Sequence, residues 1–411
     1  IRYTDDGTKP VHEGASPSPE YSGPLTIDST TLIRAAAFLP GAIDGPGRTE
    51  GYFKLGADRA NFSSDLPVIL LSSFGKGSPP TSEATTRKDV FMLIYEPDPI
   101  TSRTTLSGTP SLATRGGYRK RGSSSGGFPK YPMSLESWDE YDEDKDIEPL
   151  GFGAEGDWIL NSRFQFDLSL MRNTFLYELS NQAGRWAVKT RFVELFNDVN
   201  GGDITGDDYF GVYTFMEKIE PDKNRLDISD LDPWEDALPK LTGGYVFRKD
   251  VGTASINVTS MGGMVVNDPD PLTTNQKAYL EDYLNEMDVG LGRADGTNPT
   301  TMKHFSEYLD VSSFVDNFWF NILSMNADWG ARSQYFFKDR GGLLQAGPIW
   351  DYDRSMGARD FDDDNPEVWD WSAGHSDTFY DSEYPWYGRL FGFSSNNQPT
   401  PGASSTRPDV F

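Results

Sequence analysis

The apolar runs of this sequence are short and are interrupted by turn residues. The longest, such as residues 67–71, have the length of a β-strand, and none approaches the roughly 18 apolar residues of a membrane-spanning helix. Glycine and proline number 41 and 27, while 26 Phe, 19 Tyr and 10 Trp supply the large side chains that strands favour. The sequence therefore predicts a globular protein of strands and long turns, with a few helices packed on them.

Length, charge and cysteine content narrow the classes of protein. A chain of 411 residues is long enough for two or three domains, each with its own core. With 37 basic and 63 acidic residues, the formal net charge is −26. This charge argues against a nucleic-acid partner, because phosphate backbones are bound by clustered Lys and Arg. The absence of cysteine excludes thiolate catalysis and zinc–thiolate or iron–sulfur sites, but leaves the compartment open.

Short β-type runs separated by turn residues occupy the N-terminal segment. They cover residues 1–3, 25–27 and 31–38. Strands at this spacing are typical of a small β-sandwich, which we place at residues 1–57. The remaining residues, 58–411, open on a buried-strand pattern and are predicted to form the second, larger domain.

An acidic run follows at residues 139–148, with the sequence DEYDEDKDIE. We interpret it as a solvated loop between strands. A calcium site is the alternative, but the run lacks both the DxDxDG order and the distal Glu of a calcium loop.

Three helices are predicted from apolar residues that recur with a period near 3.6. The first covers residues 167–182 and has Asp167 as its N-cap. The second covers residues 275–287. The third, residues 310–326, has an apolar stripe too wide for a surface helix and is expected in the core. Strands precede, separate and follow these helices, which indicates a two-lobed α+β enzyme. The predicted apolar face of the first helix consists of Leu168, Met171, Phe175 and Leu179.

Carboxylates are the best candidates for chemistry, because the only histidines are His12, His304 and His375. Asp328 follows the third helix at the entry to a predicted hairpin. Asp351 and Asp353 come at the end of the hairpin's second strand. Side chains alternate between the two faces of a strand, so these two residues, two apart, are expected on the same face.

A hairpin would bring these three carboxylates together. Carboxylates so close are costly unless one is protonated or a hard cation such as Mg²⁺ lies among them. The alternative is that each aspartate caps a turn.

A basic glycine- and serine-rich segment lies upstream, at residues 114–130 (TRGGYRKRGSSSGGFPK). Backbone amides of such a turn can bind an anion, and Arg121 and Lys130 would supply charge next to phosphate oxygens. A flexible hairpin with a solvated basic flank is equally compatible with this composition.

Ordered motifs give the chain a resemblance to the CotH kinase family. They are KRGSSSGGFPK at 120–130, GDWIL and FDLSLMRN within 156–173, YFGVYTFMEKI at 209–219, GGYVFRKD at 243–250, NADW at 326–329 and PIWDYDRSMG at 348–357. The N-terminal pattern YT-x-DGT-x-P, Y-x-GP and IRA-x-AF resembles the chitobiase/hexosaminidase C-terminal-like β-sandwich. This second resemblance implies an accessory module, with possible contact to a cell-surface glycan.

The CotH resemblance implies an atypical two-lobed protein-kinase-like fold and transfer of phosphate from ATP, with Mg²⁺, to Ser or Thr of an extracytoplasmic bacterial protein. Asp328 resembles the aspartate that positions or deprotonates the acceptor hydroxyl. Asp351 resembles a metal-binding aspartate, and Asp353 would share that metal. By position, the phosphate-contacting loop of the family is matched by Arg121, Ser124 and Lys130. The segment that meets adenine is matched by Met216, Glu217 and Lys218. A pair of helix residues with a structural or phosphate-directed role is matched by Arg172 and Asn173.

Some features depart from the family pattern. A second metal ligand, often asparagine, is expected soon after the catalytic aspartate, where this chain offers Ser333 and Gln334. Residues 197–208 enlarge a turn that is usually short. The loop-like tail at 393–411 leads us to expect a C-terminally truncated domain. Two other functions therefore stay open: a carbohydrate-active hydrolase using Asp328 and Asp351, and an inactive spore-coat or surface scaffold.

Overall fold

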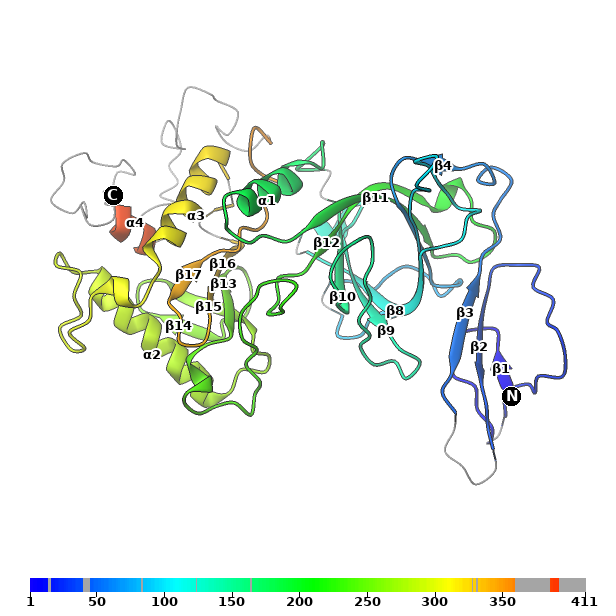
Figure 1. The fold of residues 1–411 in the computed structure, drawn as a ribbon, viewed down its shortest axis with the longest axis horizontal. Helices are drawn as coiled ribbons and strands as arrows, with labels where there is room; N and C mark the ends of the chain where they lie inside the picture. The colour runs from blue at the N-terminus through cyan, green and yellow to red at the C-terminus, as the bar shows by residue number, and fades with distance from the viewer. Residues whose placement is uncertain are drawn as a thin grey trace. The chain divides into compact units, whose positions relative to one another are not determined.

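The structure is a computed structural model that describes residues 1–13, 16–39, 45–82, 84–122, 124–162, 165–326, 328–329, 332–358 and 385–391. The fold is mixed α/β, mostly strands with few helices (Figure 1). The chain forms two compact units: Ile1–Arg163 with Thr190–Lys218, and Phe164–Lys189 with Ile219–Phe411. The predicted domain boundary at residue 57 stays a prediction, and the tail at 393–411 lies outside the described residues.

The first unit contains a closed seven-stranded barrel with the order β10-β12-β11-β5-β6-β8-β9. Neighbouring strands are antiparallel, except that β11 runs parallel to β5. The barrel strands are β5 (Val68–Ser72), β6 (Lys88–Tyr95), β8 (Leu112–Lys120), β9 (Met133–Trp138), β10 (Asp157–Asn161), β11 (Thr190–Asp198) and β12 (Tyr209–Glu217). A two-stranded ribbon pairs β4 (Ser63–Ser64) with β7 (Thr104–Thr105), and short 3₁₀ turns are η1 (Ser125–Gly127) and η2 (Gly206–Asp208).

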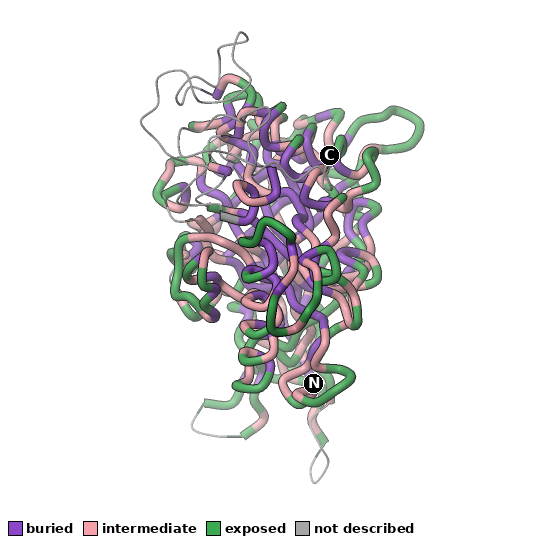
Figure 2. The backbone as a smooth tube through the Cα atoms, turned by 90° about the vertical axis from the view of Figure 1, so that its left-hand side faces the viewer, coloured by how far each residue is buried: buried purple, intermediate pink, exposed green. Residues whose placement is uncertain are grey.

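The uninterrupted apolar run of β5 has a structural reason, because both faces of this strand are covered. Ile69 and Leu71 belong to one hydrophobic cluster with residues such as Met92 and Leu195. Val68 and Leu70 belong to a second cluster, which includes Leu32 of the N-terminal sheet. A strand covered on both sides loses the alternation of apolar and polar residues. Figure 2 shows the buried stretches of the chain in purple and the exposed ones in green.

The N-terminal sheet of the first unit has three antiparallel strands in the order β1-β2-β3. These are β1 (Arg2–Thr4), β2 (Thr31–Ala36) and β3 (Arg48–Tyr52). The N-terminal sheets are consistent with the predicted β-sandwich. The strand predicted at residues 25–27 was wrong, since this segment is irregular, and β3 was missed because its sequence, RTEGY, is largely polar.

The acidic run at 139–148 is a largely exposed loop between β9 and β10, which confirms its prediction as a solvated loop, and it also makes specific contacts. Glu140 accepts hydrogen bonds from the backbone N–H and the hydroxyl of Thr49, at 2.8 and 2.7 Å. The side chain of Arg34, only 3% exposed, forms ion pairs with Glu140 and Asp142. Asp142 also pairs with Arg115 of β8. These contacts attach the N-terminal sheet to the barrel within the first unit.

The second unit is a five-stranded antiparallel sheet, ordered β14-β15-β13-β16-β17, with helices packed on it. The strands are β13 (Tyr245–Lys249), β14 (Ile256–Val258), β15 (Gly262–Asp268), β16 (Gln334–Lys338) and β17 (Leu344–Ala346). The helices are α1 (Arg172–Gln182), α2 (Thr274–Leu291), α3 (Val311–Ser324) and α4 (Pro385–Phe391), with 3₁₀ turns η3 (Lys240–Thr242) and η4 (Phe305–Glu307). No helix in the described ranges is both long and apolar enough to cross a membrane.

Helices α2 and α3 confirm their predictions to within a few residues. A capping box formed by Thr273 and Gln276 begins α2 one residue earlier than predicted. Asp310 caps α3 by accepting a hydrogen bond from the backbone of Ser312, at the residue where the helix was predicted to begin. Helix α2 packs against β14 and α3 packs against β17, so both cover the sheet.

The predicted apolar face of α1 was wrong. Its four residues, Leu168, Met171, Phe175 and Leu179, are 73, 57, 52 and 41% exposed. The helix instead buries Asn173, Leu176, Tyr177 and Ser180. Periodicity alone selected the more apolar side, whereas the buried side contains polar groups that bind a neighbouring loop, as described below.

A buried lysine makes the stability of the second unit depend on pH. The side chain of Lys338 is buried under the ring of Tyr283, 4.7 Å from its centroid, and its ammonium donates to the carbonyl of Thr242. Burial lowers the pKa of Lys338 from 10.5 to about 8. Below about pH 8 both the folded and unfolded states bind this proton, so the free-energy cost of burying a charged ammonium in the folded state is fully present. Between about pH 8 and 10.5 only the unfolded state keeps it, so stability rises with pH.

We therefore expect Lys338→Met to raise the free energy of unfolding at pH 7 and to lose the rise between pH 8 and 10.5. Urea unfolding at a series of pH values measures both effects. Lys277→Met, at a side chain 43% exposed on α2, is the matched control and should retain the wild-type slope. An unchanged slope in Lys338→Met would contradict the assignment.

Candidate metal and catalytic site

Three aspartates of the second unit lie together, as their positions in the sequence predict. Each of Asp328, Asp351 and Asp353 offers a carboxylate oxygen, and these oxygens all lie within 4.8 Å of one another. Hard oxygen ligands at this spacing fit a divalent cation such as Mg²⁺. The donor set is therefore compatible with the metal that the sequence implies.

Asp328 is positioned by the end of α3. The helix stops at Met325, whose φ of 51° is in the left-handed region. The next residue, Asn326, is buried and donates from its amide to Asn321 Oδ1 at 3.1 Å. Its own Oδ1 accepts a hydrogen bond from the backbone N–H of Asp328 at 3.2 Å. Side-chain amides thus fix the turn that presents this carboxylate.

Asp351 is positioned by α1 rather than by a strand. The strand predicted to reach Asp353 was wrong, because β17 ends at Ala346 and Asp351 has a φ of 69°. The backbone N–H of Asp351 donates to Tyr177 Oη at 3.1 Å, and that of Tyr352 to Asn173 Oδ1 at 2.6 Å. These two bonds explain why α1 buries a polar face. They hold a left-handed conformation that is uncommon outside glycine.

Asp353 is the most deeply placed of the three, with no exposed surface. Its neighbour Tyr352 is also buried and donates from its hydroxyl to Asn321 Oδ1 at 2.8 Å. Burial raises the pKa of Tyr352 well above its ordinary value, so this hydroxyl stays protonated and remains a donor. Ionising a buried carboxylate is costly unless cations or donors lie nearby, and a cation among the three carboxylates would offset that cost.

Two further polar side chains touch the carboxylates. Ser333 Oγ donates to Asp351 Oδ2 at 3.0 Å. Arg354 Nη1 donates to Asp328 Oδ1 at 2.9 Å, forming an ion pair. Ser333 was predicted only as a metal ligand, and Arg354 was not predicted as a site residue. The position of Arg354 directly after Asp353 is the sequence signal that could have identified this arginine as part of the site.

Gln334, the predicted further metal ligand, is buried in a different set of contacts. Its Nε2 donates to Asn317 Oδ1 at 3.0 Å and to Tyr387 Oη at 3.4 Å. This amide nitrogen therefore ties β16 to α3 and α4. Coordination of a metal through Gln334 stays a prediction.

The residues predicted to form the phosphate-contacting loop and the adenine-binding segment lie in the first unit, whereas Arg172 and Asn173 lie in the second. Ser124 is the residue directly before the 3₁₀ turn η1, and Arg121 lies between β8 and this turn. Lys130 Nζ donates to the carbonyl of Val212 at 2.6 Å, and burial lowers the pKa of this lysine. Glu217, only 1% exposed, ends β12 opposite Trp158. The ligand-binding roles of these residues stay predictions.

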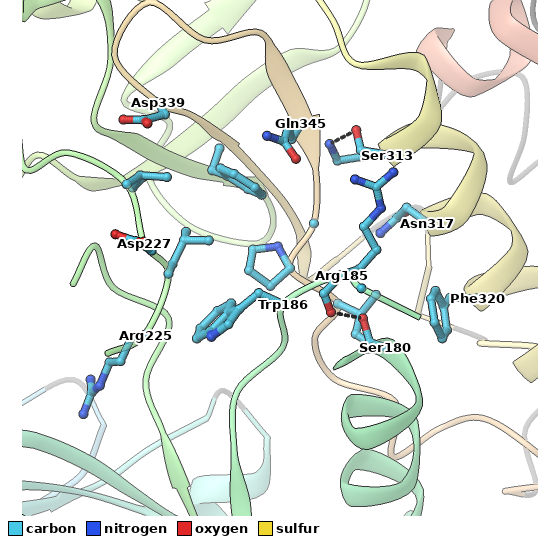
Figure 3. A pocket seen from close by; sticks show the side chains of 18 residues that line it. Ser180, Arg185, Trp186, Arg225, Asp227, Ser313, Asn317, Phe320, Asp339 and Gln345 are labelled. Atoms are coloured by element: carbon cyan, nitrogen blue, oxygen red, sulfur yellow. Dashed lines mark hydrogen bonds between the residues drawn. The ribbon is translucent and has the colours of Figure 1, made fainter. Parts of the chain in front are cut away.

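A cavity of about 310 Å³ lies in the second unit and was not predicted (Figure 3). Its lining comes from the end of α1, from α3, from β17 and the residues after it, and from residues 225–228. Trp186 and Arg225 contribute to the wall, and the lining continues through Ile349 toward the chain segment that carries Asp351. Its volume is at the lower end of small-molecule sites.

Comparison with known families adds to this geometry. A model described as CotH kinase protein matches residues 118–392, which include all three aspartates. The chain belongs to the CotH kinase protein family. A model described as Fn3 associated matches residues 1–52. The N-terminal module is therefore similar to Fn3-associated domains, and its resemblance to a chitobiase-like module is not confirmed. No curated protein matches this chain significantly.

Proposed function

We propose that this CotH family member is a protein kinase that transfers the γ-phosphate of ATP to a Ser or Thr hydroxyl, with Mg²⁺ as cofactor. The single observation that carries the proposal is the meeting of Asp328, Asp351 and Asp353 within 4.8 Å, inside the region that matches the family. In phosphoryl transfer the protein contributes mainly positioning and neutralisation of charge.

Each aspartate has a distinct proposed role. Asp351 and Asp353 would hold Mg²⁺, which supplies charge neutralisation on the phosphates when it is bound. Asp328, whose turn is fixed by Asn326, orients the acceptor hydroxyl and accepts its proton. The acceptor oxygen forms a bond to the γ-phosphorus as the bond to the β-bridging oxygen breaks, and ADP leaves. Arg121, Ser124 and Lys130 would contact the phosphates, and Glu217 would lie near adenine.

The hydrolase alternative is less well supported by the geometry. Paired carboxylates of inverting glycosidases are separated by about 6.5–9.5 Å, and those of retaining enzymes by about 5–5.5 Å. Here a third carboxylate, that of Asp353, accompanies the pair, with one oxygen of each residue within 4.8 Å of the others, and three clustered carboxylates suit a cation better than an acid and a nucleophile. Aromatic side chains beside these aspartates would be candidates to line a sugar cleft. However, Trp329 is only 2% exposed, and Trp350 stacks on Tyr177 with ring centroids 6.0 Å apart.

The proposed substrate and location follow from the family. We propose a Ser/Thr-rich protein at a bacterial surface or spore coat as the acceptor, with the Fn3-associated module at residues 1–52 as an accessory part. A two-lobed kinase-like fold that binds ATP belongs to the same proposal.

The direct test is incubation of the full chain with Mg²⁺, γ-labelled ATP and a Ser/Thr-rich acceptor protein. We expect label on acceptor serine or threonine, or on the protein itself, together with release of ADP. Calorimetric titration with ATP and Mg²⁺ identifies the alternative. Absence of both transfer and nucleotide binding would refute the kinase and favour an inactive scaffold.

A further inference from the structure

The carboxylate site includes a cationic side chain, the guanidinium of Arg354. This guanidinium donates from Nη1 to Asp328 Oδ1 at 2.9 Å, and its Cζ lies 5.4 Å from the ring centroid of Phe166. The side chains of Arg354 and Asp328 are only 22 and 14% exposed. An ion pair so shielded from water is weakened less by salt than one on the surface.

The backbone fixes this arginine relative to the site. It lies in the turn that directly follows Asp353. Ser355 Oγ donates to the carbonyl of Tyr352 at 2.7 Å, within this turn. The N–H of Met356 then donates to the carbonyl of Ser324, the last residue of α3, at 2.8 Å. The same helix end leads to Asp328, so both partners of the ion pair are positioned by α3.

The formal charges indicate that the three aspartates have different roles, one pairing with Arg354 and two facing the metal. Three ionised carboxylates carry −3, a divalent cation supplies +2, and one guanidinium supplies +1, so the assembled site is neutral. An oxygen that accepts from Arg354 is directed toward a cation other than the metal. Asp351 and Asp353 are then the pair that faces the metal.

We propose that Arg354 is a positioning residue that keeps Asp328 out of the coordination shell of the metal. Asp351 and Asp353 then bind the divalent cation, and Asp328 stays available to the acceptor hydroxyl. This inference rests on the proposed function for the role of Asp328. The metal-binding part stands independently and is tested without turnover.

The experiment measures Mn²⁺ affinity of the full chain by calorimetry and by electron paramagnetic resonance. Loss of a positive charge a few ångströms from a divalent ion, with release of a third carboxylate, is expected to make Arg354→Met bind Mn²⁺ about tenfold more tightly. Arg354→Lys should stay close to wild type. Arg293→Met removes the same charge from an exposed ion pair with Asp295 and should leave affinity unchanged.

A double variant separates chelation by Asp328 from a general charge effect. In an Asp328→Asn background, Arg354→Met should lose most of its gain, because no third carboxylate is released. With active protein, Arg354→Met should lower kcat while the KM for ATP changes little, since the released Asp328 would coordinate metal. Arg354→Gln tests the same charge loss if Arg354→Met unfolds at a lower temperature.

The outcomes separate this inference from the proposed function. Weaker or unchanged Mn²⁺ binding in both neutral Arg354 variants, or no Mn²⁺ binding by the wild type, would overturn the role of Arg354. Tighter binding in those variants, with no phosphate transfer by the wild type, would support the role of Arg354 in metal binding and refute the kinase.

Discussion

Asp351→Asn is expected to lower phosphate transfer about a thousandfold or more while the protein stays folded. The substitution keeps the shape of the side chain and an oxygen that can accept a hydrogen bond from Ser333 Oγ. In the wild type this hydrogen bond joins Ser333 Oγ to Asp351 Oδ2 at 3.0 Å. It removes one of the two charges that we assign to the metal. Loss of the metal removes most of the charge stabilisation that phosphoryl transfer requires.

The same substitution has an expected effect on stability that is independent of activity. Without metal, three carboxylates within 4.8 Å repel one another, so Asp351→Asn should unfold at the same temperature as the wild type or slightly higher. With Mg²⁺ the wild type should gain stability and the variant should not. Thermal unfolding with and without Mg²⁺, beside labelled transfer, measures both results.

Asp295→Asn is the matched control for Asp351→Asn, because this aspartate is 64% exposed and pairs with Arg293 away from the carboxylate site. It should keep wild-type transfer and the full Mg²⁺ shift. Transfer by Asp351→Asn at more than a tenth of the wild-type rate would rule out the assignment of Asp351 as the metal ligand.

Trp386→Ala is expected to lower the free energy of unfolding by about 3–5 kcal/mol, the range for deletion of a buried large aromatic side chain. This residue of α4 is fully buried, with its ring centroid 5.3 Å from that of Phe336 and 6.5 Å from that of Phe314. Its Nε1 also donates to Asp288 Oδ1 at 3.1 Å. The substitution therefore creates a cavity and removes a buried hydrogen bond.

Trp319→Ala makes the same chemical change on α3, where the side chain is 42% exposed. Its cost should stay below about 1 kcal/mol, because surface substitutions rarely exceed that value. Urea unfolding of both variants provides the comparison. Equal costs would contradict the packing of α4 in the core of the second unit.

The elements predicted correctly from sequence are those with strong local signals. Helices α2 and α3 combine a capping residue, Thr273 or Asp310, with a sustained period of 3.6. Strand β5 was recognisable as a continuous apolar run. The proximity of Asp328 and Asp351 followed from the hairpin of β16 and β17 between them.

The incorrect predictions concern residues whose environment comes from distant parts of the chain. Helix α1 buries Asn173 and Tyr177 because the loop at residues 351–352 needs acceptors for its N–H groups. The acidic run at 139–148 is the solvated loop that the sequence predicts, but its contact through Glu140 with Thr49, 91 residues away in the sequence, was not predicted. Neither partner can be inferred from periodicity or composition.

The amino-acid sequence alone identifies the residues of the site, namely the aspartates at positions 328, 351 and 353 and the family motifs around them. Local sequence also determined where most helices and strands form, because caps and apolar periods act within a few residues. Which cation each carboxylate faces, however, depends on the tertiary structure. The ion pair of Asp328 with Arg354 and the left-handed conformation at Asp351 depend on contacts that form when α1, α3 and the hairpin pack together.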